Sequence, residues 1–302
     1  MVSVIIPNYN HAPFLDERLD TVFSQTYQDF EVIILDDRST DNSLEILQPY
    51  ATHPKVSHFV ANEVNSGSPF KQWKRGVSLA KGEWIWIAES DDIADPTFLE
   101  RMMQAVAKHP SVGLAYSYLR WIDAAGKTLG VDQVDGATHY YTGKQFAVQK
   151  LLYTTTIYNV SSCIFRRDAF MQVDCSFFET MRCSGDYGFY AQMAQVTDVL
   201  EVKEVLTGYR QHASNTSRQM MKAGVSCQED LAVLNLICDK YNIPQSKYAK
   251  YWARMQSFYR LPWSVRTTIF KAYWKKHPRI VLWSLYYLVY NLLRKIWRNI
   301  KR

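Results

Sequence analysis

The sequence predicts an α/β protein with a largely parallel central sheet and helices on both faces. Short apolar runs, such as residues 2–6, 30–35 and 84–88, have the length and composition of buried strands. Segments with apolar residues at helical spacing separate these runs. Because strands and helices alternate, the parallel α/β class is favoured over an all-helical or all-strand fold.

The boundaries of the first elements are marked by residues with strong local preferences. Pro7 ends the first strand, and Pro13 suits the first turn of the helix that follows. Residues 38–42 are rich in helix-capping side chains, so a second helix should begin near Leu44. In chain order we expect strands at residues 2–7, 30–37, 56–60, 84–88, 112–121, 162–166 and 199–209, and helices at 13–23, 44–47, 70–80, 95–109, 144–152 and 187–196.

The pattern changes twice along the chain. Residues 123–160 are a looser mixture and are expected to form mostly loops, apart from the short helix at 144–152. Helices dominate from about residue 229. We therefore predict an α/β domain over residues 1–217 and a helical, basic region over residues 218–302.

Charge is divided unevenly between these regions. The whole chain has a formal net charge of +6, but residues 240–302 contain 15 Lys and Arg and no Asp or Glu. Residues 1–239 carry 20 basic and 29 acidic side chains, a net charge of −9. A strongly basic end region indicates a polyanionic partner.

Cysteine usage and the start of the chain both indicate the cytoplasm. The five cysteines form no Cys-x-x-Cys pair and are odd in number, so we expect reduced thiols. The first strand begins at Val2, which leaves no room for a secretory leader.

Two of the predicted strands end in clustered carboxylates: Asp36 and Asp37 on one, and Glu89, Asp91 and Asp92 on the other. Open α/β sheets bind ligands at the carboxyl ends of their strands. Three acids in four positions repel one another unless a cation neutralises them, and Mg²⁺ or Mn²⁺ favours carboxylate and phosphate oxygens together. The alternative is a solvated acidic turn.

An aromatic residue, Tyr9, follows the first strand and should lie at the same edge. A stacking ring beside a carboxylate that accepts an N–H forms a suitable seat for a nucleobase. No G-x-G-x-x-G or P-loop motif follows a strand, which argues against a dinucleotide cofactor and a P-loop nucleotidase.

Several short motifs occur together in order: VSVIIPNYN at residues 2–10, SQTY at 24–27, the stretch 31–41, and AKGE at 80–83 before the acidic cluster. This series, over about residues 1–215, resembles glycosyltransferase family 2 of the bacterial cell-surface polysaccharide type. The resemblance implies the GT-A fold, a Rossmann-like α/β fold. It also implies inverting transfer of a sugar from a nucleotide diphosphate sugar, assisted by Mn²⁺ or Mg²⁺.

The resemblance implies a nucleotide pocket at the end of the first two strands. Tyr9 would stack on the base, Asp37 would accept its ring N–H, and Pro7 and Asn10 would line the pocket. A pyrimidine with a ring N–H suits this pair, so we expect a UDP- or dTDP-linked donor.

The resemblance also implies a diphosphate and metal site. Glu89, Ser90 and Asp91 occupy the D-x-D positions, with Asp91 as the direct metal ligand. His212 matches a loop histidine that reaches the metal or the diphosphate. Trp73 and Lys74 replace an Arg-Asn pair common in the family, so Lys71, Lys74 and Arg75 are the candidates to contact the diphosphate. A solvated helix face is the alternative for each of these cations. The remaining histidines, His11 among them, lack ligand spacing and are assigned no role.

Asp186 matches the base on the acceptor side, where the family usually has Glu-Asp and this chain has Gly185-Asp186. A carboxylate within reach of the acceptor hydroxyl removes its proton as attack proceeds. Without the resemblance, Asp186 would be interpreted as a helix cap. The Glu at position 89 and the missing acid beside Asp186 leave a second hypothesis, a catalytically silent nucleotide-sugar-binding or scaffold protein.

The basic region contains an apolar segment, residues 280–293, with cations on both sides. Its 14 residues are fewer than the roughly 20 needed to span a bilayer. We expect a helix lying on an anionic membrane at its cytoplasmic face, which would suit a glycan or lipid-linked saccharide acceptor. A buried core helix is the alternative, and the long apolar run disfavours nucleic acid as the partner.

Overall fold

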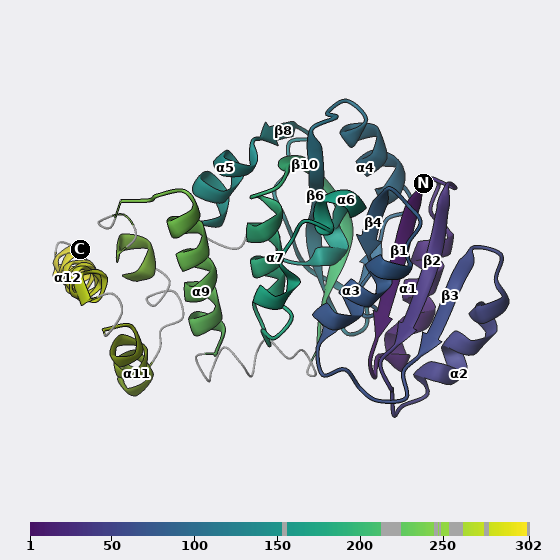
Figure 1. Ribbon diagram of the computed structural model, residues 1–302, viewed down its shortest axis with the longest axis horizontal. Helices are drawn as coiled ribbons and strands as arrows, with labels where there is room; N and C mark the ends of the chain where they lie inside the picture. Colours follow the sequence, from purple (N-terminus) through teal and green to yellow (C-terminus); the bar gives the residue numbers. More distant parts are fainter. Residues whose placement is uncertain are drawn as a thin grey trace.

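The computed structural model describes residues 1–152, 156–212, 225–244, 247, 249–253, 262–274 and 278–300. Its centre is a ten-stranded sheet in the order β3-β2-β1-β4-β9-β6-β10-β5, with β7 paired to β6 and β8 to β10 (Figure 1). The strands are β1 (Val2–Asn8), β2 (Phe30–Asp36), β3 (Val56–Ala61), β4 (Trp84–Ile87), β5 (Ile93–Ala94), β6 (Val112–Asp123), β7 (Thr128–Val131), β8 (Thr138–Tyr141), β9 (Cys163–Arg166) and β10 (Asp198–Gln211).

The predicted α/β class is confirmed. β1 pairs in parallel with β2 and β4, β2 pairs in parallel with β3, and β6 with β10. Antiparallel β9 joins the two parallel groups by pairing with both β4 and β6. The helical elements are α1 (Ala12–Phe23), α2 (Ser43–Leu47), η1 (Gln48–Thr52), α3 (Pro69–Leu79), α4 (Phe98–Val106), α5 (Gly143–Phe146), η2 (Ala147–Leu151), η3 (Val160–Ser162), α6 (Arg167–Phe170), η4 (Cys175–Phe177), α7 (Gly185–Met193), α9 (Val225–Lys240), α11 (Trp263–Trp274) and α12 (Pro278–Ile300).

Three short strands lie where loops were expected. β5 has only two residues and follows the acidic turn after β4, so no periodicity could reveal it. β7 and β8 lie within residues 123–160 and are largely exposed. Neither strand has the alternation of buried and exposed residues that a half-buried strand shows. The reason is that β7 pairs with β6 and β8 pairs with β10 at the surface rather than inside a core.

Successive residues of the central strands enter two separate cores, one on each face of the sheet. Ile5 and Ile33 face a core completed by α3, α7, α9, α11 and α12. Val4 and Ile34 face a core completed by α1, α2 and α4. The alternation follows from the two-residue period of a strand, and it explains why these strands read as continuous apolar runs.

The C-terminal helices share the first of these cores. Leu231 and Leu234 of α9 belong to the same buried cluster as Phe189 of α7, and Figure 1 shows α9 running beside α7. α11 and α12 lie farther from the sheet, at the end of the molecule (Figure 1). The boundary expected after residue 217 falls outside the described residues, and the domain division stays a prediction.

α12 has one buried face and one exposed face. Ile280, Val281 and Ser284 are buried, and the Ser284 hydroxyl donates to the Ala249 carbonyl oxygen at 3.2 Å. Its exposed apolar residues are Leu282, Trp283, Tyr286, Val289, Tyr290, Leu292, Leu293, Ile296 and Trp297. The buried face fits the core-helix alternative, whereas contact of the exposed apolar face with a membrane stays a prediction. Within the described ranges, no helix is both long and apolar enough to cross a bilayer.

Candidate active site

A cavity of about 550 Å³ opens at the carboxyl ends of β1, β2 and β4. This is the edge at which the sequence predicted a ligand site. The cavity is also bordered by the loop before α3, the start of α7 and the end of β10. Its lining residues are Pro7, Asn8, Tyr9, His11, Asp37, Asn65, Gly67, Ser68, Pro69, Phe70, Gln72, Trp73, Glu89, Ser90, Asp91, Tyr158, Asn159, Val160, Met181, Arg182, Cys183, Asp186, Tyr209 and His212.

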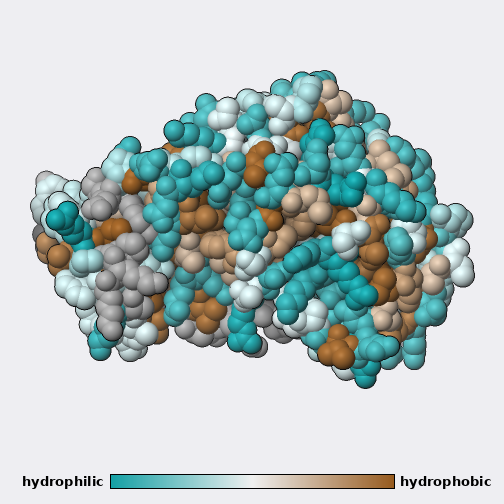
Figure 2. All heavy atoms as spheres, in the orientation of Figure 1, coloured by the Kyte–Doolittle hydropathy of each residue, from teal (hydrophilic) through white to brown (hydrophobic). Residues whose placement is uncertain are grey.

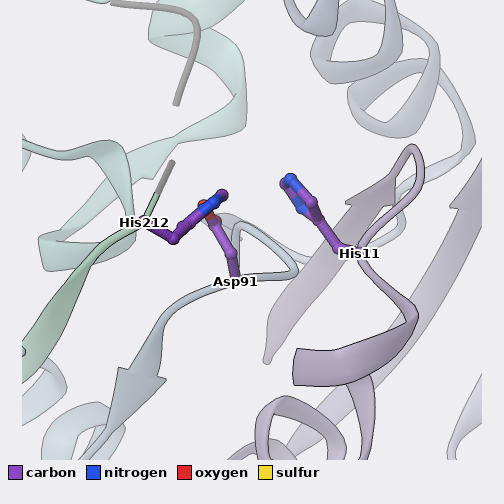
Figure 3. Close-up of side chains that lie close together, drawn as sticks. All are labelled: His11, Asp91 and His212. Carbon is purple, nitrogen blue, oxygen red and sulfur yellow. The ribbon is translucent and has the colours of Figure 1, made fainter. Parts of the chain in front are cut away.

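Two histidines flank Asp91 at this cavity (Figure 3). His212 Nε2 lies 2.9 Å from Asp91 Oδ2, and one ligand atom from each of His11, Asp91 and His212 lies within 4.8 Å of the others. Burial alone would raise the pKa of Asp91. The hydrogen bond from His212 and the electrostatic effect of the neighbouring imidazoles outweigh it and lower that pKa, which favours the charged carboxylate. His11, to which the sequence assigned no role, therefore belongs to this cluster.

Glu89 has a different environment from Asp91. Its Oε1 accepts a 2.8 Å hydrogen bond from Trp73 Nε1, and burial followed by repulsion from Asp91 raises its pKa to about 8. At neutral pH the side chain is therefore mostly uncharged. Trp73 stands at one position of the Arg-Asn pair that the family often has. Instead of a charge it offers a neutral N–H group, which donates to Glu89 at the first D-x-D position.

Two buried arginines stand behind the acidic turn. Arg18 Nε donates to the Glu89 carbonyl oxygen at 2.7 Å, and Arg210 Nε donates to the Asp91 carbonyl oxygen at the same distance. Arg18 is 0% exposed and Arg210 1% exposed. Their charges offset part of the repulsion among the acids, so repulsion alone does not require a bound cation. A cation is favoured instead by the close approach of the His11, Asp91 and His212 ligand atoms.

Asp92 is a structural member of the acidic turn. Its Oδ2 accepts from the Ser161 hydroxyl at 2.7 Å, and its Oδ1 accepts from the Arg210 backbone N–H at 3.0 Å. Burial and the adjacent Asp91 charge raise its pKa, against the charge of Arg18. Asp92 therefore joins the turn to η3 and β10 and does not line the cavity.

Asp186 lines the cavity from the first turn of α7. The N-cap residue is Ser184, so Asp186 is not the cap that the alternative interpretation required. Its Oδ1 nevertheless accepts from the Tyr187 backbone N–H at 2.7 Å. Burial, with a further contribution from the charges of Asp230 and Glu229, raises the pKa of Asp186 to about 7. A carboxylate with this pKa suits a general base near neutral pH.

The segment before Asp186 is held by a residue of the C-terminal region. Glu229 on α9 accepts backbone N–H groups from Arg182, Cys183 and Ser184 at 2.8, 3.0 and 2.8 Å. Gly185 follows, and a Cβ there would lie only 2.3 Å from the Phe70 ring. The acid expected before Asp186 therefore has no space in this chain, because the Phe70 ring occupies it.

The expected nucleotide residues divide into two groups. Tyr9, 48% exposed, lines the cavity together with Pro7 and Asp37. Asp37 Oδ1 accepts from Asn62, Ser66 and Gln72, whereas Oδ2 accepts from the Ser66 hydroxyl at 2.7 Å. A carboxylate oxygen can accept about two bonds, so Oδ2 retains capacity for a base N–H.

Asn10, Lys71 and Lys74 do not line the cavity. Asn10 has a positive φ of 57°, and its Oδ1 accepts from the Thr40 backbone N–H at 2.7 Å, which braces the loop after β1. Lys71 Nζ donates to the Ser66 carbonyl oxygen at 3.1 Å, and Lys74 pairs with Glu179 at 3.3 Å. Their nucleotide roles stay predictions. Arg182, which the sequence analysis did not single out, does line the cavity.

Comparison with known sequences identifies the family. Residues 3–174, more than half of the chain, match the family model Glycosyl transferase family 2. Glycosyltransferase GlyG of Streptococcus pneumoniae is 34% identical over 155 residues, which span 50% of this chain and 47% of GlyG. A chondroitin synthase of Escherichia coli is 25% identical over 252 residues, which span 82% of this chain and 34% of that protein. The chain thus spans about half the length of the first relative and a third of the second.

Solved structures share the fold. TarS 1-349 of S. aureus in complex with UDP-GlcNAc has a TM-score of 0.62 at 17% identity, covering 96% of this chain and 91% of that one. Mannosyltransferase PcManGT from Pyrobaculum calidifontis in complex with GDP-Man and Mn²⁺ has a TM-score of 0.56 at 17% identity, covering 98% and 87%. These similarities confirm the GT-A type of α/β fold. The matched segment contains the motifs at the ends of β1, β2 and β4, and the chain therefore belongs to glycosyltransferase family 2.

Proposed function

We propose that the chain is an inverting glycosyltransferase. It would move a sugar from a UDP- or dTDP-linked donor to a hydroxyl group of a cell-surface glycan precursor. The observation that carries this proposal is that one cavity is lined by Tyr9 and Asp37, by Asp91 and His212, and by Asp186. In this proposal the first pair would hold the nucleobase and the second pair a divalent cation, and Asp186, whose pKa is raised to about 7, would be the base.

The nucleotide end of the cavity suits a pyrimidine. Tyr9 offers a partly exposed ring for stacking, and Asp37 Oδ2 retains capacity to accept the N–H of uracil or thymine. Structural neighbours in complex with UDP-GlcNAc and with GDP-Man both share the fold, so the preference for a pyrimidine rests on Tyr9 and Asp37.

The diphosphate would lie near Asp91 and His212. Their carboxylate and imidazole fit a divalent ion such as Mn²⁺ or Mg²⁺, which when bound would stabilise the charge that develops on the departing nucleoside diphosphate. Glu89 and Ser90 occupy the wall beside them. Glu89 Oε1 accepts from Trp73 Nε1 at 2.8 Å, which fixes the carboxyl group at the wall of the cavity.

Asp186 would act on the acceptor. In its ionised form it takes the proton from the attacking hydroxyl, which raises the nucleophilicity of the oxygen as the new glycosidic bond forms. A single base opposite the leaving group gives one displacement, and therefore inversion at the anomeric carbon. The silent-protein alternative predicts no turnover at all, so donor hydrolysis without acceptor separates the two hypotheses.

Nucleotide binding and donor hydrolysis test this proposal together. The wild-type chain should bind UDP more tightly with Mn²⁺ than without, and should slowly release UDP from a UDP-sugar. Asp91→Ala should lose the Mn²⁺-dependent part of UDP binding, while His139→Ala, at an exposed position on β8, should not. Undiminished Mn²⁺-dependent binding in Asp91→Ala would show that the cation lies elsewhere, and equal binding of GDP would contradict the base seat.

We further propose that the exposed face of α12 rests on an anionic membrane surface, which would bring a lipid-linked acceptor to the enzyme. The exposed aromatic and aliphatic residues of α12 form one stripe, and residues 240–302 carry 15 cations and no acid. Figure 2 shows hydrophobic residues at the surface at the end of the molecule where α12 lies, next to hydrophilic ones. An apolar stripe bordered by cations fits the interfacial zone of a bilayer.

Vesicle flotation tests the membrane proposal. The full chain should float with anionic vesicles at low salt, and the triple variant Trp283→Ser, Tyr290→Ser, Leu293→Ser should not. The matched control replaces three exposed apolar residues elsewhere, Val64, Leu129 and Met171, with Ser. Truncation is unsuitable, because it would remove the buried Ile280 and Val281. Wild-type chain that stays at the bottom of the gradient at low salt would contradict the proposal.

A further inference from the structure

His11 occupies the N-cap position of α1, but its side chain makes no capping hydrogen bond. Short polar side chains stabilise a helix at this position by accepting a first-turn N–H, and histidine is not among the preferred residues. The ring is directed instead to the loop after β4, where His11 Nδ1 lies 2.8 Å from Ser90 Oγ. The position thus gives up a local stabilisation, which indicates that the imidazole serves the cavity.

The His11 ring lies opposite His212 across Asp91 (Figure 3). The two ring centroids are 5.6 Å apart, and Phe14, within the first turn of α1, packs against both at 6.1 and 4.9 Å. The candidate ligand atoms of His11, Asp91 and His212 lie within 4.8 Å of one another. Two ligand atoms bound to one ion at about 2.1 Å each lie up to about 4.2 Å apart, so only a small closure is needed.

We propose that His11 is the third protein ligand of the cation, beside Asp91 and His212, and that this donor set selects Mn²⁺ and later first-row ions over Mg²⁺. The inference rests on the metal site of the proposed function and adds a ligand and a selectivity to it. Mg²⁺ prefers oxygen ligands and octahedral geometry, whereas imidazole suits transition metals. A site with two imidazoles and one carboxylate therefore disfavours Mg²⁺.

Ser90 acts in this scheme as a positioning residue. A histidine ligand usually donates its second ring N–H to a neighbouring acceptor, which fixes the tautomer and the ring orientation. His11 Nδ1 has such a neighbour in Ser90 Oγ, and the proposal assigns the Nδ1 proton to this contact and the lone pair to Nε2. Three protein ligands leave the remaining coordination positions for diphosphate oxygens and water.

Metal titration of the full chain without nucleotide tests the inference. Mn²⁺ binding is followed by electron paramagnetic resonance, and Mg²⁺ and Co²⁺ are measured by competition. We expect wild-type affinity to rise from Mg²⁺ to Mn²⁺ to Co²⁺. His11→Asn should weaken Mn²⁺ binding by about 10-fold or more and reduce the preference for Mn²⁺ over Mg²⁺. The side-chain oxygen of Asn can itself bind an ion, so a second variant is needed. His11→Ala leaves no side-chain ligand atom at this position and should also weaken Mn²⁺ binding.

Controls separate this role from a general effect on folding. His139→Ala should leave Mn²⁺ affinity unchanged, and Asp91→Asn should abolish it. His11→Asn should unfold at the same temperature as wild type or higher, because Asn is a favoured N-cap residue. Unchanged Mn²⁺ affinity in both His11 variants would overturn the inference. Wild-type chain that binds no Mn²⁺ alone, yet binds UDP in a Mn²⁺-dependent way, would overturn it while leaving the proposed function in place. Wild-type chain that shows neither Mn²⁺ binding nor Mn²⁺-dependent UDP binding would overturn both this inference and the metal site of the proposed function.

Discussion

The sheet edge and helix α12 are both rich in aromatic residues, but they expose them very differently. At the edge, Trp73 and Trp86 are 2% and 0% exposed, and their indole N–H groups donate to Glu89 Oε1 and to the Ser161 carbonyl oxygen. On α12, Trp283 and Tyr290 are each 48% exposed. Buried rings with satisfied N–H groups position a site, whereas exposed rings beside cations form a surface for a partner. The difference fits the two proposals made above, that the sheet edge performs the transfer and that α12 rests on a membrane surface.

The largest expected effect is on glycosyl transfer, and it comes from a substitution of Asp186 at the sheet-edge cavity. Asp186→Asn keeps the size and the acceptor oxygen but removes basicity, so glycosyl transfer should fall by about 10² or more while UDP-sugar binding stays near normal. In wild type, transfer should increase as pH rises through about 7, because the raised pKa of Asp186 sets where it becomes ionised. Asp186→Asn should flatten this profile. Transfer rates within a few-fold of wild type would leave Asp186 a purely structural residue of α7.

A matched pair of substitutions sharpens the contrast between buried and exposed tryptophans. Trp73→Phe removes the donor to Glu89 and should lower the free energy of unfolding by about 1–3 kcal/mol. Trp283→Phe, on the exposed face of α12, should change it by less than about 0.5 kcal/mol. Urea denaturation measures both. Equal losses would mean that α12 is packed as tightly as the sheet edge.

The smallest expected effect concerns the exposed aromatic residue of the sheet edge. Tyr9→Ala should weaken UDP binding by about 1 kcal/mol, roughly five-fold, because the ring is half exposed before any base stacks on it. Tyr286→Ala, an exposed aromatic substitution on α12, should leave UDP affinity unchanged. Isothermal titration of UDP provides the comparison, and an unaltered affinity in Tyr9→Ala would place the base away from this ring.

The strands and their acidic ends could be predicted because burial leaves a local signature. β1, β2 and β4 are continuous apolar runs, and the residues that follow them, Tyr9, Asp37 and Asp91, do meet at one cavity. The edge strands β7 and β8 lack this signature, since they are largely exposed.

The partners of the acidic turn could not be predicted, because they reach it from far along the chain. Arg18 approaches from α1 and Arg210 from β10, and neither position differs in sequence from an ordinary surface arginine. His11 lies 80 residues before Asp91 and 201 before His212, so no ligand spacing could reveal the cluster. Its one local signal is a histidine at a helix start, where a short polar residue is favoured.

The three hydrogen bonds from residues 182–184 to Glu229 bear on how this enzyme could be divided or recombined. The segment that delivers Asp186 is fastened to α9, which follows the match to the family model by some fifty residues. A hybrid that joined the first 217 residues to a foreign C-terminal region would keep the residues proposed to bind the nucleotide and the cation, but it would lose the three bonds that Glu229 accepts beside Asp186. It would also lose Leu231 and Leu234, which α9 contributes to the core that it shares with Phe189 of α7. An exchange of C-terminal regions should therefore keep α9 with the first region.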